Sequence, residues 1–388
     1  LINCVGGGSS AIGFWNSFMD YSKKQVEFIG VEAGGPKNSK LHAAPLTNKS
    51  KIGILHGAAQ YVVQDKEGQI SETASISAGL DYPGVSPLHC FLKDAKRARY
   101  TAVSDEEALA AYQLIAKNEK IRPSLEPSHA FAVAIKLAPK PVRDEVAVNA
   151  TLPTMKVDQV STLLASFNGC TTIKVKVNDF VNDHLLLQEV LRHIPGAKFR
   201  LDVNGGWNLE EAIANLRNYL QEFPEQIDYV EQPCLDIADL KSLRQMVKIP
   251  IAVDESIRKY LGSDLTKLKE VADVAIIKWA PTGGFSSALE VIEKIQLPVV
   301  ISSALDSSVG ISHGLSLAAS IPNLYGPCGL ATVALLKADV TSKPLIAENG
   351  YIKNRKIVPD LIEEYKAVPE RQSWWQDRVN EIYNEVSQ

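Results

Sequence analysis

Three carboxylates recur at strand-like positions in the second half of the chain. Asp202, Glu231 and Asp254 stand 29 and 23 residues apart, and each closes a short apolar run, in FRLDVNGGW, DYVEQP and IPIAVDES. Three oxygen ligands with room for water and substrate suit Mg2+, whereas zinc prefers the His and Cys ligands that these runs lack. Strand-end caps or ion pairs are the alternative for any single carboxylate. Three on successive runs favour a magnesium site.

Lysines stand on both sides of these carboxylates. Lys174 and Lys176 lie two apart in TTIKVKV, so both would point to one face of a strand, and Lys278 follows in VAIIKWA. Repulsion between the paired ammonium groups, with partial burial, is expected to lower the pKa of a lysine towards the range of a general base. A solvent-facing strand edge explains an isolated Lys-x-Lys, but less well one beside carboxylates. The pattern predicts metal-assisted removal of a proton next to the carboxylate of a small-molecule substrate, because the resulting enediolate needs a divalent cation beside it.

Alternating strands and helices are needed to bring these groups together. Strands are predicted at VAVNATL, TIKVKV, FRLDVN, YVEQP, IPIAVDE, VAIIKWA, PVVISSA and, more weakly, LYGPCGL, with amphipathic helices such as LEEAIANLRNYL between them. Repeats of roughly 25–30 residues are the spacing of βα units. Polar side chains near the ends of so many successive strands favour an α/β fold with a (β/α)8 barrel over residues 145–340. A doubly wound open sheet is the alternative.

Composition argues against several function classes. The 388 residues are 45% hydrophobic and 22% charged with a net charge of −4, which gives no electrostatic reason to expect nucleic acid. No apolar stretch approaches the ~20 residues of a membrane span. The five cysteines are scattered without disulfide or zinc spacing, so a cytoplasmic location is expected. The chain begins at Leu1, which indicates either a non-standard start codon or a truncated upstream domain.

The character of the sequence changes around LAPKPVRDE. Upstream, glycine and small residues dominate long loops, and downstream the regular alternation begins. The expected organisation is a first domain at 1–137, a junction at 138–144, the barrel at 145–340 and a C-terminal segment at 341–388.

The motifs of the second half resemble a known family. KVKV, DVNGGW, YVEQPC, DES and IKWAPTGG are similar to the muconate-lactonizing branch of the enolase superfamily. More narrowly, VRDEVAVNATLP, VEQPC, DESIRK and SSALDSSVGISHGLSLAA resemble the actinobacterial-type o-succinylbenzoate synthases. By this resemblance Lys176 removes the alpha proton and assists departure of hydroxide, Lys174 supports it, and Lys278 steadies the enediolate. Ser302 and Ser303 fall where the family receives the succinyl end of its substrate, although a helix cap explains them equally well.

The reaction that this resemblance implies is a dehydration in menaquinone biosynthesis. Asp202, Glu231 and Asp254 would be the Mg2+ ligands, and 2-succinyl-6-hydroxy-2,4-cyclohexadiene-1-carboxylate would be converted to 2-succinylbenzoate. Another racemase or epimerase of the same branch is an alternative, because it would use the same lysine pair. A low-activity fusion remnant is a second alternative, because the family's N-terminal capping domain is expected to be absent here. Segment 341–388 would then lack its usual packing partner.

Residues 1–137 resemble a different family, the C-terminal half of the tryptophan synthase beta chain. CVGGGSSAIG, GVEAGG, HAA, LHG, SISAGLDYPGV and PSLEPSHA follow in that family's order. The resemblance implies a partial α/β segment of PLP fold type II, in which Glu126 would lie near the ring of pyridoxal phosphate (PLP). A glycine-rich turn before a helix offers backbone N–H groups to a phosphate. The implied phosphate loop comprises Gly6, Gly7, Gly8, Ser9 and Ser10.

Departures from that family predict an inactive unit. The lysine that forms the Schiff base belongs to an upstream half that this sequence lacks, and Ser10 stands where the family usually has Asn. PLP is therefore not expected as a cofactor, and tryptophan synthesis is not expected as an activity. A protein that still captures PLP is the minor alternative, and the resemblance also implies a vestigial contact surface for a tryptophan synthase alpha chain.

Overall fold

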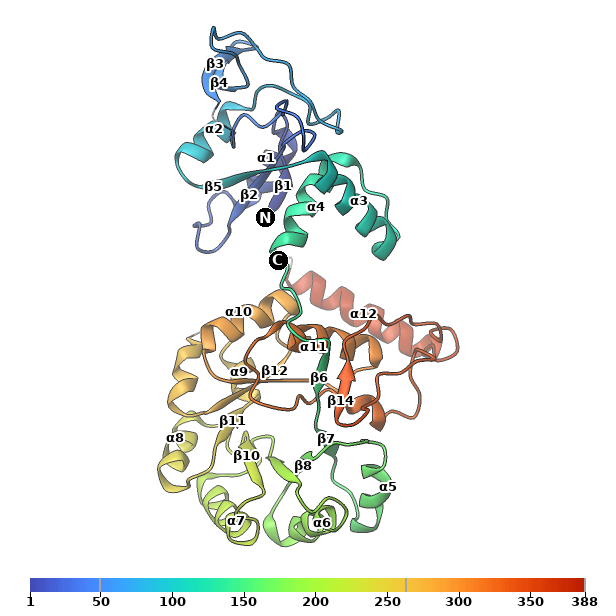
Figure 1. Cartoon of the computed structure of the whole chain (residues 1–388). Coiled ribbons are helices and arrows are strands. Elements are labelled where there is room, and N and C mark those ends of the chain that lie inside the picture. The colour runs from blue at the N-terminus through green and yellow to red at the C-terminus, as the bar shows by residue number, and fades with distance from the viewer. Residues whose placement is uncertain (49, 262–263, 387–388) are drawn as a thin grey trace. The chain divides into compact units, whose positions relative to one another are not determined.

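A computed structural model describes residues 1–48, 50–261 and 264–386 of the chain (Figure 1). The chain divides into two compact units, Leu1–Pro139 and Lys140–Gln388. Each unit has its own sheet and its own buried clusters of apolar side chains. None of the helices in the described part of the chain combines the length and the hydrophobicity that a membrane span requires.

The first unit is built on a small parallel sheet in the order β1-β2-β5. Its central strand is buried along its whole length. Trp15 stacks on Phe28, the first residue of that strand, with ring centroids 4.9 Å apart. Ser104 and Glu107 form a capping box that starts the longest helix of this unit. The elements are β1 (Ile2–Cys4), α1 (Ser9–Trp15), η1 (Asn16–Phe18), β2 (Phe28–Ala33), the hairpin β3 (Lys51–Leu55) and β4 (Ala58–Val62), α2 (Pro87–Asp94), β5 (Ala98–Val103), α3 (Asp105–Glu119) and α4 (Leu125–Leu137).

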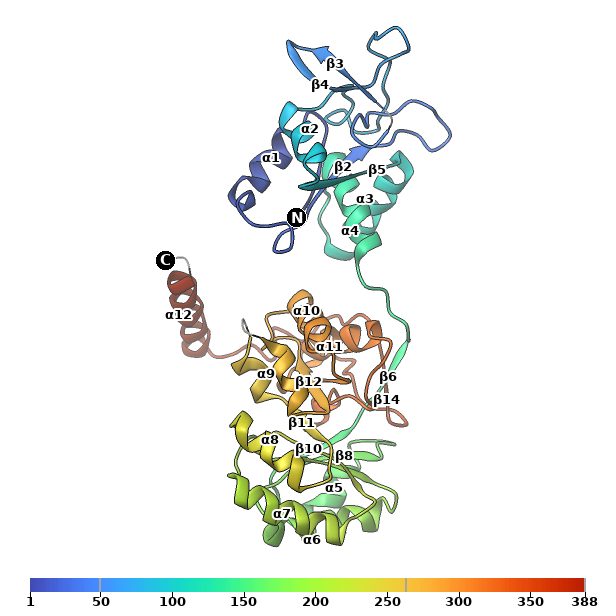
Figure 2. The ribbon, with the colours of Figure 1, turned by 90° about the vertical axis from the view of Figure 1, so that its left-hand side faces the viewer.

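The second unit is built on a curled parallel sheet in the order β7-β8-β9-β10-β11-β12-β13, the sequence order of its strands (Figure 2). This mixed α/β architecture is the one expected from the alternation of strand and helix patterns. The strands are β7 (Ala150–Leu152), β8 (Thr172–Lys176), β9 (Lys198–Asp202), β10 (Ile227–Glu231), β11 (Ile251–Val253), β12 (Val274–Lys278) and β13 (Val299–Ser302).

Helices connect the successive strands and pack against the outside of the sheet. In α7, the side chain of Asn208 accepts a hydrogen bond from the N–H of Glu211 to start the helix, and Ala212, Leu216 and Tyr219 form its buried stripe. The helices are η2 (Val157–Gln159), α5 (Val160–Leu164), α6 (Phe180–His193), α7 (Leu209–Glu222), α8 (Ile237–Met246), α9 (Glu255–Lys259), η3 (Leu265–Glu270), α10 (Phe285–Ile295), α11 (Ser308–Ser320) and η4 (Thr332–Leu335).

The weak eighth strand expected at LYGPCGL is a bridging segment rather than a regular strand. The N–H of Tyr325 donates to the carbonyl of Val299, and the N–H of Gly329 donates to that of Ile301, so the segment lies along β13. On its other side, Cys328 forms a parallel bridge with Val148, just before β7. Backbone hydrogen bonds therefore run from the last strand back to the first, as in a TIM-like barrel.

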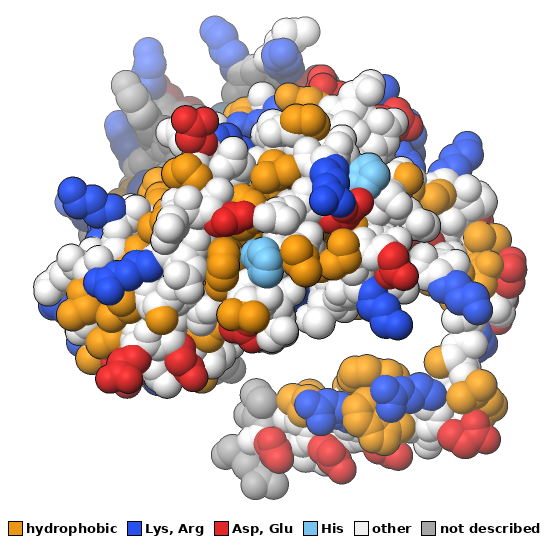
Figure 3. All heavy atoms as spheres, turned by 90° about the horizontal axis from the view of Figure 1, so that it is seen from below, with side chains coloured by type: hydrophobic (Ala, Val, Ile, Leu, Met, Phe, Trp, Pro, Cys, Tyr) orange, Lys and Arg blue, Asp and Glu red, His pale blue; other side chains and the backbone are white. Residues whose placement is uncertain are grey.

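The first expected strand, VAVNATL, is divided in two. Its beginning, β6 (Glu145–Ala147), pairs antiparallel with β14 (Tyr351–Lys353), and only its end forms β7 in the main sheet. The last helix, α12 (Pro369–Val386), is exposed at every described side chain. Figure 3 shows hydrophobic and charged side chains together along it.

Candidate active site

The carboxyl ends of β8 to β12 carry the polar side chains that the sequence singled out. Lys176 pairs in register with Asp202, and Asp202 with Glu231, so the last residues of three adjacent strands lie side by side. Asp254 directly follows β11, and Lys278 ends β12. The predicted gathering of these residues at one end of the sheet is what the strand register produces.

Alternation along the strands directs these charges to the inside of the curl. Tyr229, Val274, Ile276 and Val300 form a small apolar cluster, separate from the large one that the helices cover. Because side chains two apart share a face of a strand, Glu231 lies on the same face as Tyr229. The charged side chains therefore share the inner face of the sheet with this apolar cluster. The buried guanidinium of Arg200 lies in the same layer, 4.8 Å from the ring of Tyr229.

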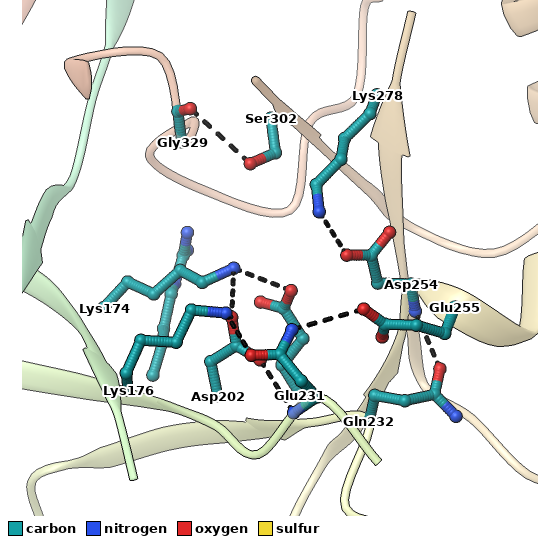
Figure 4. Close-up of polar contacts among 12 residues, drawn as sticks. Lys174, Lys176, Asp202, Glu231, Gln232, Asp254, Glu255, Lys278, Ser302 and Gly329 are labelled. Carbon is teal, nitrogen blue, oxygen red and sulfur yellow. Dashed lines mark hydrogen bonds and ion pairs between the residues drawn. The ribbon is translucent and has the colours of Figure 1, made fainter. Parts of the chain in front are cut away.

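Lys174 forms ion pairs with two of the three carboxylates (Figure 4). Its ammonium lies 2.8 Å from Asp202 Oδ2 and 2.7 Å from Glu231 Oε1, and its side chain is only 9% exposed. Burial would lower the pKa of Lys174, but the two carboxylates raise it well above its ordinary value. The expectation that repulsion from Lys176 lowers the pKa of Lys174 is therefore wrong. The carboxylates of Asp202 and Glu231 contact the Lys174 ammonium directly, and the sequence does not reveal these contacts across strands.

The other two lysines reach the carboxylates from opposite sides, as Figure 4 shows. The Lys176 ammonium contacts Asp202 Oδ2 and Asn204 Oδ1, and the Lys278 ammonium contacts Asp254 Oδ2. The Lys176 side chain is 34% exposed, so it is the more open of the two. A molecule above the carboxylates would meet an ammonium group on each side.

Glu231 is the most confined of the three carboxylates. Its burial, followed by repulsion from Asp202, raises its pKa to about 7, although Lys174 opposes the shift. Burial would also raise the pKa of Asp202, but Lys174 and Lys176 together bring it below its ordinary value. The second oxygen of Glu231, Oε2, is buried without a hydrogen-bond partner.

A divalent cation is the group that this donor set would take. The buried Oε2 of Glu231 lacks a partner, and the neighbouring donors, Asp202 and Asp254, are also carboxylates, so the chemistry fits a hard cation such as Mg2+. Within the described residues, no three His, Cys, Asp or Glu side chains stand close enough together to hold a metal. The carboxylates form ion pairs with the lysines instead. The Lys174 ammonium would therefore have to move away before Asp202 and Glu231 could bind one ion.

The two serines at the end of β13 do not cap a helix. Ser302 Oγ lies 3.5 Å from the carbonyl of Gly329, and Ser303 Oγ lies 2.7 Å from Thr332 Oγ1. The residue that precedes α11 is Ser307. The helix-cap interpretation of Ser302 and Ser303 is wrong, and a role in substrate binding stays a prediction.

The glycine-rich segment of the first unit forms a turn before a short helix. Gly8 has φ +101°, and its carbonyl lies 2.9 Å from His89 Nε2. A cavity of about 460 Å3 adjoins Gly7 and Ser86. Glu126, at the start of α4, accepts hydrogen bonds from Ser77 Oγ at 2.7 Å and the N–H of Gly79 at 3.2 Å. The assignments to a vestigial cofactor site stay predictions for Gly6, Gly7, Gly8, Ser9, Ser10 and Glu126.

Sequence reasoning missed two polar residues that complete the site. Asn204 accepts from Lys176 and donates from Nδ2 to Glu255 Oε1 at 3.2 Å. Gln232 is fully buried between the ends of β10 and β11. Each could have been found from its spacing, because Asn204 follows Asp202 by two residues and Gln232 directly follows Glu231.

Comparison with known proteins places this geometry in a family. The model of the Enolase C-terminal domain-like family matches residues 157–360. An o-succinylbenzoate synthase of Mycobacterium tuberculosis (strain ATCC 25618 / H37Rv) is 41% identical over 254 residues, 64% of this chain and 76% of that protein. The chain belongs to the o-succinylbenzoate synthase family. A second member, from Thermobifida fusca (strain YX), is 40% identical over 62% of this chain and 76% of its own length. The chain is thus an enzyme of the lyase class within the enolase superfamily.

Solved structures agree with this assignment at the level of the fold. A muconate lactonizing enzyme from Pseudomonas fluorescens, complexed with muconolactone, superposes with a TM-score of 0.54 at 18% identity, over 68% of this chain and 78% of its own. The identity is too low to carry function. The similarity supports the curled parallel sheet as the family's barrel.

Proposed function

We propose that this chain is an o-succinylbenzoate synthase that dehydrates 2-succinyl-6-hydroxy-2,4-cyclohexadiene-1-carboxylate to 2-succinylbenzoate, a step of menaquinone biosynthesis. The observation that carries the proposal is the placement of Lys176 and Lys278 on opposite sides of three buried carboxylates (Figure 4). The sequence identity to curated members of the family supports the choice of substrate.

Lys176 and Lys278 would have different roles in an elimination reaction. Lys176 takes the proton from the carbon next to the substrate carboxylate, and the electrons of the broken C–H bond move into that carboxylate. They then return to form the ring double bond as the C–O bond breaks, and the Lys176 ammonium returns its proton so that hydroxide leaves as water. Lys278 stays charged and stabilises the negative charge that develops between the two steps.

Asp202, Glu231 and Asp254 would hold Mg2+ in this scheme. A bound Mg2+ would supply positive charge beside the substrate carboxylate while it carries a second negative charge. The three carboxylates are at most 2% exposed, and charge interactions are stronger at buried positions than in water. Formation of the aromatic ring of the product drives the dehydration. The chain's own residues therefore need mainly to position the substrate and to move one proton.

The first unit would take no part in this reaction. We propose that residues 1–137 form a tryptophan synthase beta-like unit without PLP chemistry, joined through 138–144 to the barrel at 145–340. Within the described chain, the cavity beside Gly7 is lined by no lysine that could form an imine.

The test is turnover of the cyclohexadiene substrate by the full chain with Mg2+. Lys176→Ala and Lys278→Ala should each lower kcat by at least 100-fold, in keeping with loss of a general base or a charge stabiliser (a factor of about 10²–10⁴). Lys241→Ala is the matched control, because Lys241 pairs with Glu270 on the exposed surface and should leave turnover unchanged. Unchanged turnover in either site variant, or racemisation of N-succinylamino acids as the faster reaction, would contradict the proposal.

A further inference from the structure

Gln232 uses its whole side-chain amide to tie two strand ends together. Its Oε1 accepts hydrogen bonds from the backbone N–H groups of Asp254 and Ser256, both at 3.0 Å. Its Nε2 donates to the carbonyl of Cys234 at 2.8 Å and to Ser256 Oγ at 2.7 Å. The side chain is fully buried, so no water competes for these bonds.

The backbone of Gln232 joins a third strand end to this network. Its N–H donates to the carbonyl of Ala252 at 2.8 Å, and its carbonyl accepts from the N–H of Gly205 at 2.6 Å. Gly205 lies in the turn after β9, three residues past Asp202. Gln232 also has φ +40°, a left-handed conformation that a residue with a side chain rarely adopts. Such backbone conformations persist where the surrounding bonds hold them in place.

We propose that Gln232 is a positioning residue that fixes the Asp254 carboxylate relative to Glu231, and so sets the divalent-cation site. The inference rests on the proposed metal-dependent function. Gln232 directly follows Glu231 and holds the peptide of Asp254, so one side chain sets the spacing between two of the three carboxylates. It also anchors the N–H of Ser256, which fixes the first turn after β11 and with it the partner of Lys278.

The variant that tests this role is Gln232→Met, which keeps the length of the side chain but removes its four hydrogen bonds. Loss of a residue that orients metal ligands typically lowers metal affinity by about 10–100-fold. Q232M should weaken Mg2+ binding by that factor, measured on the full chain without substrate by calorimetry and by the Mg2+-dependent shift in melting temperature. The amides of Asp254 and Ser256 should also exchange their hydrogen faster.

Asp273→Ala provides a matched control at the other end of β11, although Asp273 itself lies directly before β12. Asp273 Oδ2 accepts from the N–H of Ile251 at 3.0 Å, so it anchors the opposite end of β11. D273A should speed exchange at Ile251 and lower the melting temperature, yet bind Mg2+ as the unmodified chain does.

Three outcomes would overturn the inference. If Q232M binds Mg2+ as tightly as the unmodified chain, Gln232 has only a structural role. If D273A weakens Mg2+ binding as much as Q232M, the effect belongs to general loss of stability. If the unmodified chain itself binds no Mg2+, the proposed metal-dependent function fails, and the inference fails with it.

Discussion

At the scale of single residues, the site is organised by charge pairs rather than by any one carboxylate. Lys174 compensates both Asp202 and Glu231 in a place where an uncompensated charge is costly. The sequence could predict that a Lys-x-Lys pair and three carboxylates meet, because strand periodicity and strand-end position decide that. It could not predict which lysine pairs with which carboxylate, because that depends on distances across strands.

Lys174→Met should therefore destabilise the chain in the absence of Mg2+. Removing one partner from a buried ion pair costs on the order of 3–5 kcal/mol, because the remaining charge stays buried. Glu231 would then have to take up a proton, so the loss should be larger at pH 8 than at pH 5. Urea unfolding followed by circular dichroism measures the change.

Lys241→Met is the control for Lys174→Met. Lys241 forms an ion pair with Glu270, and both side chains of this pair are exposed to solvent. Exposed pairs contribute about 0–1 kcal/mol, so this variant should unfold close to the unmodified chain. Equal stability of the two variants would show that Lys174 does not neutralise buried charge.

At the scale of elements, the sequence located most of the barrel and missed its irregular places. Long amphipathic patterns such as the one in α7 predict helices well, because one apolar stripe must be buried. The last strand pattern fails at Gly326, Pro327 and Gly329, because proline offers no N–H to a ladder and glycine offers no side chain to pack. The position of Gln232 next to Glu231 is visible in the sequence, but its hydrogen bonds could not be predicted, since its partners come from three separate turns.

The bridging segment at 324–329 should be sensitive to any side chain at Gly329. A Cβ there would lie 2.5 Å from Ser302 Oγ and 3.2 Å from Ser302 Cβ. Gly329→Val should thus force β13 and the segment apart and lower the free energy of unfolding by about 1–3 kcal/mol, the usual cost of overpacking. Gly196→Ala is the control, because a Cβ at Gly196 meets no atom within 4 Å. A G329V chain as stable as G196A would mean that the segment does not hold the ring together.

At the scale of the whole molecule, two units of different character share one chain. The second unit contains the residues that the family model matches, and the first unit contains a buried carboxylate of its own. Glu32 is fully buried in β2 and accepts hydrogen bonds from the N–H of Leu46 and from the N–H and hydroxyl of Thr47. Burial raises the pKa of Glu32 to about 7 despite these bonds.

This raised pKa predicts a pH dependence confined to the first unit. Folding favours the protonated form of Glu32, so its stabilising effect is complete below the ordinary pKa of 4.5 and is lost as the pH rises through about 7. The loss amounts to about 3 kcal/mol, since each pKa unit corresponds to about 1.4 kcal/mol. Glu32→Gln removes the titration and should flatten the profile. Amide hydrogen exchange of the intact chain between pH 5 and 8, corrected for intrinsic rates, should show the difference in β1, β2 and β5.

The same experiment separates the two units. Because Leu1–Pro139 and Lys140–Gln388 are compact by themselves, E32Q should leave exchange in β8 to β12 unchanged at every pH. Mg2+ should protect β8 to β12 and leave β1, β2 and β5 as they were, since a ligand stabilises only the unit that binds it. If E32Q altered exchange in the barrel strands, or if Mg2+ slowed exchange in the first unit, the two units would unfold as one, and the stability of the catalytic barrel would depend on the unit that precedes it.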